Sequence, residues 1–197
     1  MEDLINVFEK KGYQVKCFKD SKAASDDLLK DIRIDDIVGI GGSVTILDMG
    51  LYEQLTNRGN TVYWHWKSED KKETLANAKN ADVYLSSVNA ISKDGKIVNM
   101  DGTSNRVSSM IYGHRDVYLI VGKNKICNNL QEAIDRIYTV AAPKNAKRIN
   151  AKTPCSFTGK CNDCSSPDRI CCTEVIFHKK PNGSNIILYF IDEELGY

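Results

Sequence analysis

The chain has 197 residues, of which 42% are hydrophobic, so it is long enough to bury one substantial core. Its 27 basic and 26 acidic residues leave a formal charge of +1, which excludes the strong positive field that recruits nucleic acid or an anionic membrane surface. The longest apolar runs are far shorter than the roughly 20 residues that cross a bilayer, and the acidic start Met1-Glu2-Asp3-Leu4 is unlike a signal peptide. We expect a cytoplasmic protein with no nucleic-acid partner and no membrane insertion.

Helix-like and strand-like segments alternate through the first half of the chain. In chain order, the apolar spacing predicts a helix at 3–11, a strand at 13–18, a helix at 21–30, a strand at 36–40, a helix at 44–59, a strand at 61–66, a helix at 69–80 and a strand at 82–86. Such alternation favours parallel strands joined by right-handed crossovers. The fold class is therefore α/β, with a layered, Rossmann-like sheet.

The next segments predict a hairpin and one further strand and helix. Strand-like runs at 88–92 and 96–99 flank Lys93-Asp94-Gly95, a turn that suits a β-hairpin. A short helix at 107–111, an apolar strand at 117–121 and a helix at 128–140 complete this part. We expect residues 1–150 to form the α/β domain.

Periodicity is lost after residue 140. A small and basic stretch leads into a cysteine-rich segment, and the two strand-like runs 174–178 and 185–191 flank Pro181-Asn182-Gly183-Ser184. These runs predict a terminal β-hairpin. Residues 151–197 are thus expected to form a cysteine-rich, metal-binding tail and a hairpin that pack on the same domain.

Five of the seven cysteines lie between Cys155 and Cys172. Cys161 and Cys164 form a Cys-x2-Cys knuckle, and Cys155 and Cys171 approach it from either side to complete four thiolates. In a reducing compartment such clusters bind metal or carry out redox chemistry more often than they form disulfides. An iron-sulfur cluster and a zinc ion both suit four thiolates, and free redox thiols are the third alternative. Cys172 is a spare thiol, either an alternate ligand or a bystander.

A glycine-rich loop, Gly39-Ile40-Gly41-Gly42-Ser43-Val44-Thr45, stands where a strand ends and a helix begins. Small residues and free amides at such a place can hold a phosphate or a carboxylate. The loop matches neither the dinucleotide fingerprint nor a Walker loop, and a tight structural turn explains it equally well.

A second polar group follows the predicted hairpin. Asp101 can act as a base or accept a hydroxyl group, and Arg106 can clamp an anion; the alternative is a capped turn with local pairing. Lys125 follows an apolar strand at the same expected edge, where it either neutralises substrate charge or is simply solvated. His65, His114 and His178 have no spaced partner, so we expect structural roles for them.

Several of these motifs together resemble one family. They are Gly41-Gly42-Ser43-Val44-Thr45, Val88-Asn89-Ala90-Ile91, Asp101-Gly102-Thr103-Ser104-Asn105-Arg106, Val121-Gly122-Lys123-Asn124-Lys125-Ile126 and the tail from Cys161 to Cys171. The set resembles the lactate-utilisation (LUD, formerly DUF162) domain family, in a short single-domain branch. The resemblance implies a fold like that of glucosamine-6-phosphate deaminase, ribose-5-phosphate isomerase and coenzyme A transferases. It also implies work beside iron-sulfur and flavin redox proteins that oxidise lactate.

Three hypotheses follow. The first is a metal-bearing, iron-sulfur accessory or redox protein of lactate and organic-acid utilisation, possessing an anion-binding pocket; it would serve as an oxidoreductase component. The second is a small-molecule enzyme with a structural metal, acting on a phosphorylated or carboxylate substrate. The third is a zinc-stapled binding module without catalysis. Oligomeric state stays open.

The candidate catalytic residues are Asp101 and Lys125. The candidate residues for binding a small anionic molecule are Gly41, Gly42, Ser43, Val44, Thr45, Asn89, Asn105 and Arg106. The candidate metal ligands are Cys155, Cys161, Cys164 and Cys171.

Overall fold

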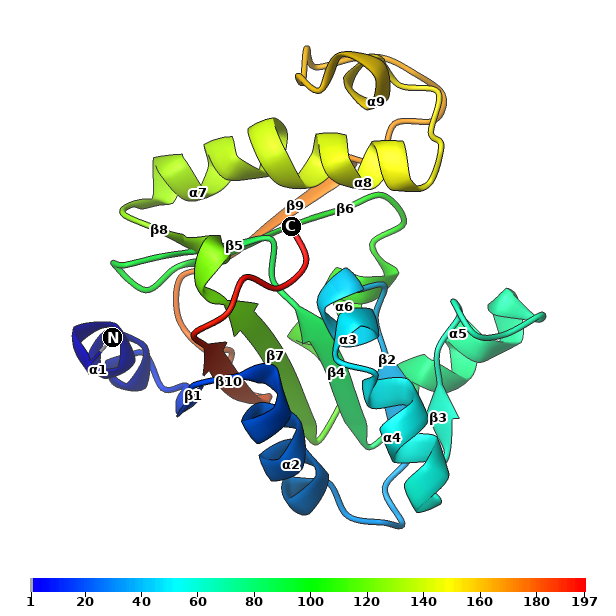
Figure 1. Ribbon diagram of the computed structural model, residues 1–197, viewed down its shortest axis with the longest axis vertical. Coiled ribbons are helices and arrows are strands. Elements are labelled where there is room, and N and C mark those ends of the chain that lie inside the picture. Colours follow the sequence, from blue (N-terminus) through cyan, green and yellow to red (C-terminus); the bar gives the residue numbers. More distant parts are fainter. Residues whose placement is uncertain (1) are drawn as a thin grey trace.

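A six-stranded sheet lies at the centre of the computed structural model, which describes residues 2–197 (Figure 1). Its strand order is β1-β10-β7-β4-β2-β3, and its strand pairs are parallel. The strands are β1 (Gln14–Phe18), β2 (Val38–Ile40), β3 (Val62–Tyr63), β4 (Val83–Ser87), β7 (Asp116–Gly122) and β10 (Asn185–Ile191). The predicted layered α/β fold is confirmed.

Helices cover both faces of this sheet because alternate residues of its central strands point to opposite sides. Tyr118 and Ile120 of β7 belong to the hydrophobic cluster on one face of the sheet. Val117, Leu119 and Val121 belong to the cluster on the other face. On the first face lie α2 (Ser21–Asp31), α3 (Val44–Asp48) and α4 (Leu51–Arg58). On the second lie α1 (Glu2–Lys10) and α6 (Asn105–Ile111), while α5 (Lys71–Lys79) packs beside β2 and β3.

A smaller sheet forms the second layer, with strand order β8-β5-β6-β9. Its strands are β8 (Ile126–Cys127), β5 (Ala90–Ser92), β6 (Ile97–Asp101) and β9 (Thr173–Phe177). The predicted hairpin between β5 and β6 is confirmed, because Ala90 pairs with Val98 in antiparallel register.

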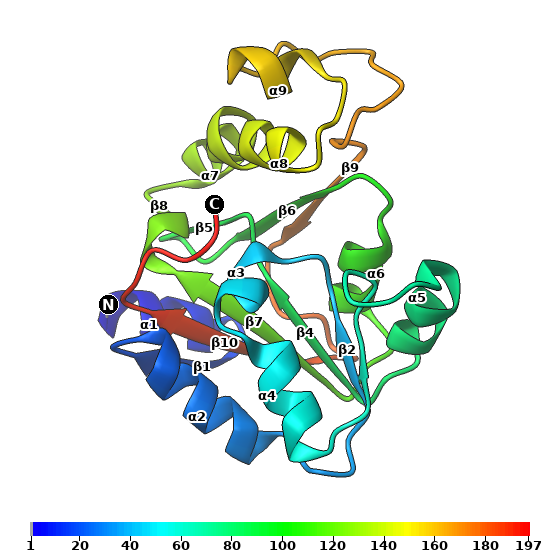
Figure 2. The same cartoon turned by 45° about the vertical axis from the view of Figure 1, so that its right-hand side comes forward.

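A helical rod lies over the smaller sheet (Figure 2). It consists of α7 (Leu130–Arg136), a π-helical turn (Ile137–Ala141) and α8 (Ala142–Arg148), and α9 (Pro154–Thr158) packs on its end. Ala133 and Ile137 bury their side chains against the sheet. The rod therefore extends eight residues beyond the predicted helix end at 140, and the π-helical turn accommodates Pro143 at the start of α8.

The predicted terminal hairpin is wrong. β9 pairs antiparallel with β6 in the smaller sheet, whereas β10 lies between β1 and β7 in the central sheet and is parallel to both. Residues 186–191 are all buried, which requires cover on both faces. A terminal hairpin on the surface would leave that apolar strand exposed. The strand is therefore buried in the central sheet, although the local turn sequence favours a hairpin.

No helix within residues 2–197 is both long and apolar enough to cross a lipid bilayer.

Candidate functional site

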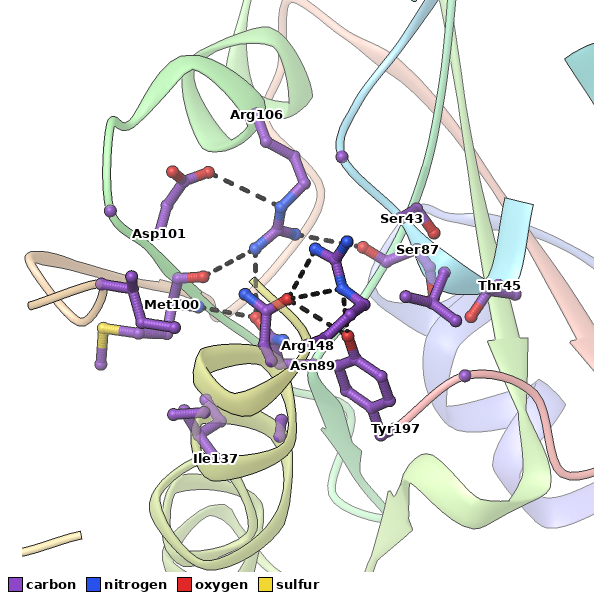
Figure 3. A pocket seen from close by; sticks show the side chains of 18 of the residues that line it. Ser43, Thr45, Ser87, Asn89, Met100, Asp101, Arg106, Ile137, Arg148 and Tyr197 are labelled. Carbon is purple, nitrogen blue, oxygen red and sulfur yellow. Dashed lines mark hydrogen bonds and ion pairs between the residues drawn. The ribbon is translucent and has the colours of Figure 1, made fainter. Parts of the chain in front are cut away.

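A cavity of about 290 Å³ lies where the carboxyl ends of the central strands meet the smaller sheet and the helical rod (Figure 3). Most of the residues that line it come from loops after β2, β4, β6, β7 and β10, or from the rod above them. The lining includes Gly42, Ser43, Val44, Thr45, His65, Trp66, Ser87, Asn89, Met100, Asp101, Asn105, Arg106, Lys125, Ile137, Asn145, Arg148, Cys171, Gly196 and Tyr197. Ligands of open α/β sheets bind at this edge.

The structure brings the predicted pocket residues together. Nine of the ten candidate catalytic and anion-binding residues line the cavity, and Gly41 lies directly behind its wall. Their chain positions run from 42 to 125, so the gathering results from the fold and not from sequence proximity.

The glycine pair lets three large side chains approach the loop after β2. A Cβ on Gly41 would lie 2.9 Å from Arg106 Cγ and 2.8 Å from Tyr84 Oη, and one on Gly42 would lie 3.2 Å from Trp66 Cζ2. Ser43 then caps α3 by accepting a hydrogen bond from the amide of Ile46 at 3.2 Å. Glycine is needed here for close packing around the cavity.

Replacing Gly41 with alanine should lower the free energy of unfolding by about 1 to 3 kcal/mol, because a well-packed wall must move to admit the methyl group. Gly183→Ala is the matched control, since its Cβ would meet only Tyr112, at 3.9 Å. Urea unfolding measures both. Equal, small effects from the two substitutions would show that Gly41 is not needed for packing.

Arg106 is buried, and the protein holds its guanidinium in one orientation. Nη1 donates to Asn99 Oδ1 at 2.9 Å and to the Ser87 carbonyl at 3.2 Å. Nη2 donates to the Met100 carbonyl at 2.7 Å and to Asn89 Oδ1 at 3.1 Å. These four bonds occupy the terminal N–H groups, so what Arg106 contributes to the cavity is fixed positive charge rather than a free bidentate fork.

Asp101 provides the carboxylate of the cavity wall. Its Oδ1 accepts the amides of Thr103 and Ser104 at 3.0 and 2.9 Å, which holds the turn into α6. Its Oδ2 is 3.6 Å from Arg106 Nε and has no hydrogen-bond partner within residues 2–197. The capped-turn alternative is thus present in the structure, and one carboxylate oxygen remains open beside it.

Lys125 is 2% exposed and its ammonium has no carboxylate partner within residues 2–197. Its Nζ donates to Thr45 Oγ1 at 2.8 Å and to Ser87 Oγ at 2.6 Å. Burial, together with the charges of Arg136 and Arg106, lowers the pKa of Lys125 to about 7, while Asp48 acts to raise it. This amine therefore changes its charge near neutral pH.

The sequence patterns assigned no role in the site to several further side chains that line the cavity. Arg148 lies over the ring of Trp66 at 4.4 Å, and its Nε donates to Tyr197 Oη at 2.7 Å. Its Nη1 has no protein acceptor within residues 2–197, so it offers an open donor at the mouth of the cavity. His65, expected to be structural, also lines the cavity, and its Nδ1 is buried without a partner in the described chain. The two tryptophans that flank His65 were the sequence feature that could have indicated its place in the site.

The four candidate metal ligands lie in one segment beside this cavity. Asp163, with a left-handed backbone (φ 47°), donates its amide to Cys161 Sγ at 3.4 Å, which bends the knuckle around that sulfur. Burial, together with the nearby Cys161, Cys155 and Cys164, raises the pKa of Cys171 to about 11, while Arg169 acts to lower it. Cys171 also lines the cavity, so the thiol segment and the pocket share a wall.

These thiols are neighbours but not a formed coordination site. Within residues 2–197, no three side chains of histidine, cysteine, aspartate or glutamate are arranged to hold a metal ion. Cys172 donates its thiol to the Arg169 carbonyl at 3.4 Å and is exposed.

Residues 1–191 match the family described as LUD domain. The chain belongs to the LUD domain family. This family is associated with lactate utilisation. The matched residues include the glycine loop, the cavity loops and the cysteine segment. No curated protein is significantly similar in sequence.

A protein of the DUF162 family from Deinococcus radiodurans has a crystal structure similar to that of this LUD domain. The TM-score is 0.55 over 95% of this chain and 94% of that chain, at 10% sequence identity. At such low identity the likeness concerns the fold alone. It supports the layered α/β architecture that positions the cavity.

Proposed function

We propose that this LUD domain binds a small carboxylate of the 2-hydroxy or 2-oxo acid class and acts as a metal-bearing accessory or redox component of organic-acid oxidation. The observation that carries the first half is the charge of the cavity. Within the described residues, three basic side chains, Arg106, Lys125 and Arg148, line it with one carboxylate, Asp101. Arg106 and Lys125 are buried, and among residues 2–197 Asp101 pairs with Arg106 alone, so a bound anion would offset the cost of burying the remaining positive charge.

The size of the cavity favours a small acid. Its volume of about 290 Å³ is at the lower end of ligand pockets, which typically run from roughly 300 to 1,000 Å³. Ile137 and Met100 supply apolar contact for a short carbon chain, while Arg148 has an open donor for a carboxylate. A three- or four-carbon acid fits these features better than a nucleotide-sized ligand.

A thermal-stability panel tests the ligand class. Millimolar lactate and pyruvate should raise the melting temperature, since a ligand at 100 times its Kd stabilises by about 2.7 kcal/mol. Sugar phosphates and acyl thioesters at the same concentration should raise the melting temperature less. A panel in which no acid, phosphate or thioester shifts the melting temperature would contradict anion binding in this cavity.

The second half of the proposal assigns Cys155, Cys161, Cys164 and Cys171 to one metal centre, an iron-sulfur cluster with zinc as the alternative. Support comes from the amide hydrogen bond to Cys161 Sγ and from Cys155, which is buried against Ile170, the neighbour of Cys171. Four thiolates suit either metal. The proposal requires these thiols to draw closer together when the metal binds.

Metal analysis of anaerobically purified protein, with visible spectra before and after dithionite, tests this assignment. Iron, sulfide and a broad band that bleaches on reduction are expected, and Cys161→Ser should remove them. Cys17→Ser is the control, because Cys17 lies on β1, outside the thiol segment. A colourless sample without iron or sulfide contradicts the cluster, and one equivalent of zinc in it supports the structural alternative.

A further inference from the structure

The hydrogen bonds around Lys125 fix which groups donate and which accept. Ser87 Oγ donates its proton to the Ile120 carbonyl at 2.7 Å, and Thr45 Oγ1 donates its proton to the Leu195 carbonyl at 3.3 Å. Each hydroxyl therefore presents a lone pair to Lys125 Nζ, which donates to both. Two acceptors match the two N–H groups of a neutral amine and leave its lone pair unused. A charged ammonium would leave its third N–H without an acceptor in the described chain.

The surroundings of this amine favour its neutral form. Lys125 is 2% exposed, and its hydrogen-bond partners are neutral. The guanidinium of Arg106 contacts Ser87 through the main-chain carbonyl while Lys125 contacts it through the hydroxyl, so the two basic groups meet at one residue. A lysine that is desolvated beside another cation is a nucleophile toward carbonyl carbon.

We propose that Lys125 forms a reversible imine with the ketone carbon of a 2-oxo acid bound in the cavity. The lone pair of Nζ attacks the carbonyl carbon, the C=O π pair moves to oxygen, and one proton passes from nitrogen to that oxygen. The C–O bond of the resulting carbinolamine then breaks. The second proton leaves nitrogen and departs with the oxygen as water, while the C=N bond forms. No oxidant or reductant takes part.

The other groups of the cavity have roles in this reaction. Arg106 and Arg148 attract the carboxylate next to the ketone. A 2-hydroxy acid has no carbonyl at this carbon and would bind without reacting. This inference rests on the proposed anion binding, because the carboxylate brings the ketone to the amine.

Borohydride trapping with pyruvate tests the imine, followed by peptide mass mapping of the wild-type chain. Reduction makes the linkage permanent, so the peptide that contains Lys125 should gain one reduced pyruvate unit at least tenfold more than peptides with surface lysines. Excess lactate should protect it. Lys125→Arg should lose the adduct, whereas Lys123→Arg, at a half-exposed lysine paired with Asp192, should retain it.

The outcomes separate the two proposals. Pyruvate that raises the melting temperature but leaves the Lys125 peptide unmodified, or labels it no more than surface lysines, overturns the imine and keeps anion binding. Pyruvate that neither stabilises the protein nor labels this peptide overturns both. Because the label is mapped on the wild-type chain, the test stands even where Lys125→Arg fails to fold.

Discussion

Replacing Arg106 with methionine is expected to lower the free energy of unfolding by about 3 to 5 kcal/mol, because it breaks a buried charged network and leaves Asp101 without its counterion. The substitution also strands the oxygens of Asn89 and Asn99 and the Met100 carbonyl, which now accept from the guanidinium. Urea unfolding measures the loss.

Two comparisons give the Arg106 result its meaning. Arg33→Met removes an exposed arginine that pairs with Asp35, and it should change stability by no more than about 0.5 kcal/mol. Arg106→Lys retains the positive charge that Arg106 contributes to the cavity but not the planar fork that bonds the protein oxygens, so it should fold better than Arg106→Met and bind carboxylates more tightly than that variant. An Arg106→Met protein as stable as Arg33→Met would contradict the role of Arg106 as the centre of this network.

Replacing Lys125 with methionine is expected to change how stability depends on pH. The pKa of Lys125 is about 7 in the folded chain and about 10.5 when unfolded, so between these values the unfolded chain binds more protons. Wild-type stability should therefore rise relative to Lys125→Met by about 1.4 kcal/mol per pH unit from pH 7 to pH 10. Below pH 7 both states carry the proton, and the full cost of burying the charge remains.

Unfolding curves at several pH values between 6 and 10 provide the measurement. Burial is the main cause of the lowered pKa of Lys125, Arg136 and Arg106 lower it as well, and Asp48 raises it. Lys123→Met is the control, because Lys123 is half-exposed and bonded to Asp192. The stability of Lys123→Met should change with pH in the same way as that of the wild type. If the wild type and Lys125→Met also run parallel from pH 7 to 10, the lysine is not a buried amine with a lowered pKa.

Much of the site was predictable because strand ends can be read from the sequence. Apolar runs that stop at Gly41-Gly42 and just before Lys123 place these loops at one edge of a parallel sheet, and the structure has them there. The polar turn around Asp101 could be predicted as well. What no local pattern could supply was the partner of each side chain. Packing across the sheets decides that Arg106 is saturated by protein oxygens while Lys125 is not paired with an acid.

The terminal hairpin shows where local signals fail. Pro181-Asn182-Gly183-Ser184 between two strand-like runs is a strong turn pattern, and the chain does turn there. However, the two runs join different sheets, because residues 186–191 are apolar on both faces and bury most surface between β1 and β7. In a hairpin, such a strand would be hydrogen-bonded along only one edge and buried on only one face.

Arg148 was missed for a related reason. Its segment has small and basic residues and contains Pro143, which argues against a continuing helix. The π-helical turn before α8 absorbs the proline, and the helix then carries Arg148 to the mouth of the cavity, where it lies over Trp66. Neither the turn nor the stacking leaves a pattern in the sequence of this segment.

Titration calorimetry with lactate and with its neutral amide, lactamide, tests the central claim most directly, since the two differ in charge and hardly in shape. We expect lactate to bind at least tenfold more tightly than lactamide at pH 6, where Lys125 is protonated. The affinity for lactate should weaken as the pH rises above 7, because the amine then loses its charge. Equal affinities for the two compounds, or no binding of lactate at either pH, would contradict an anion-binding site in this cavity.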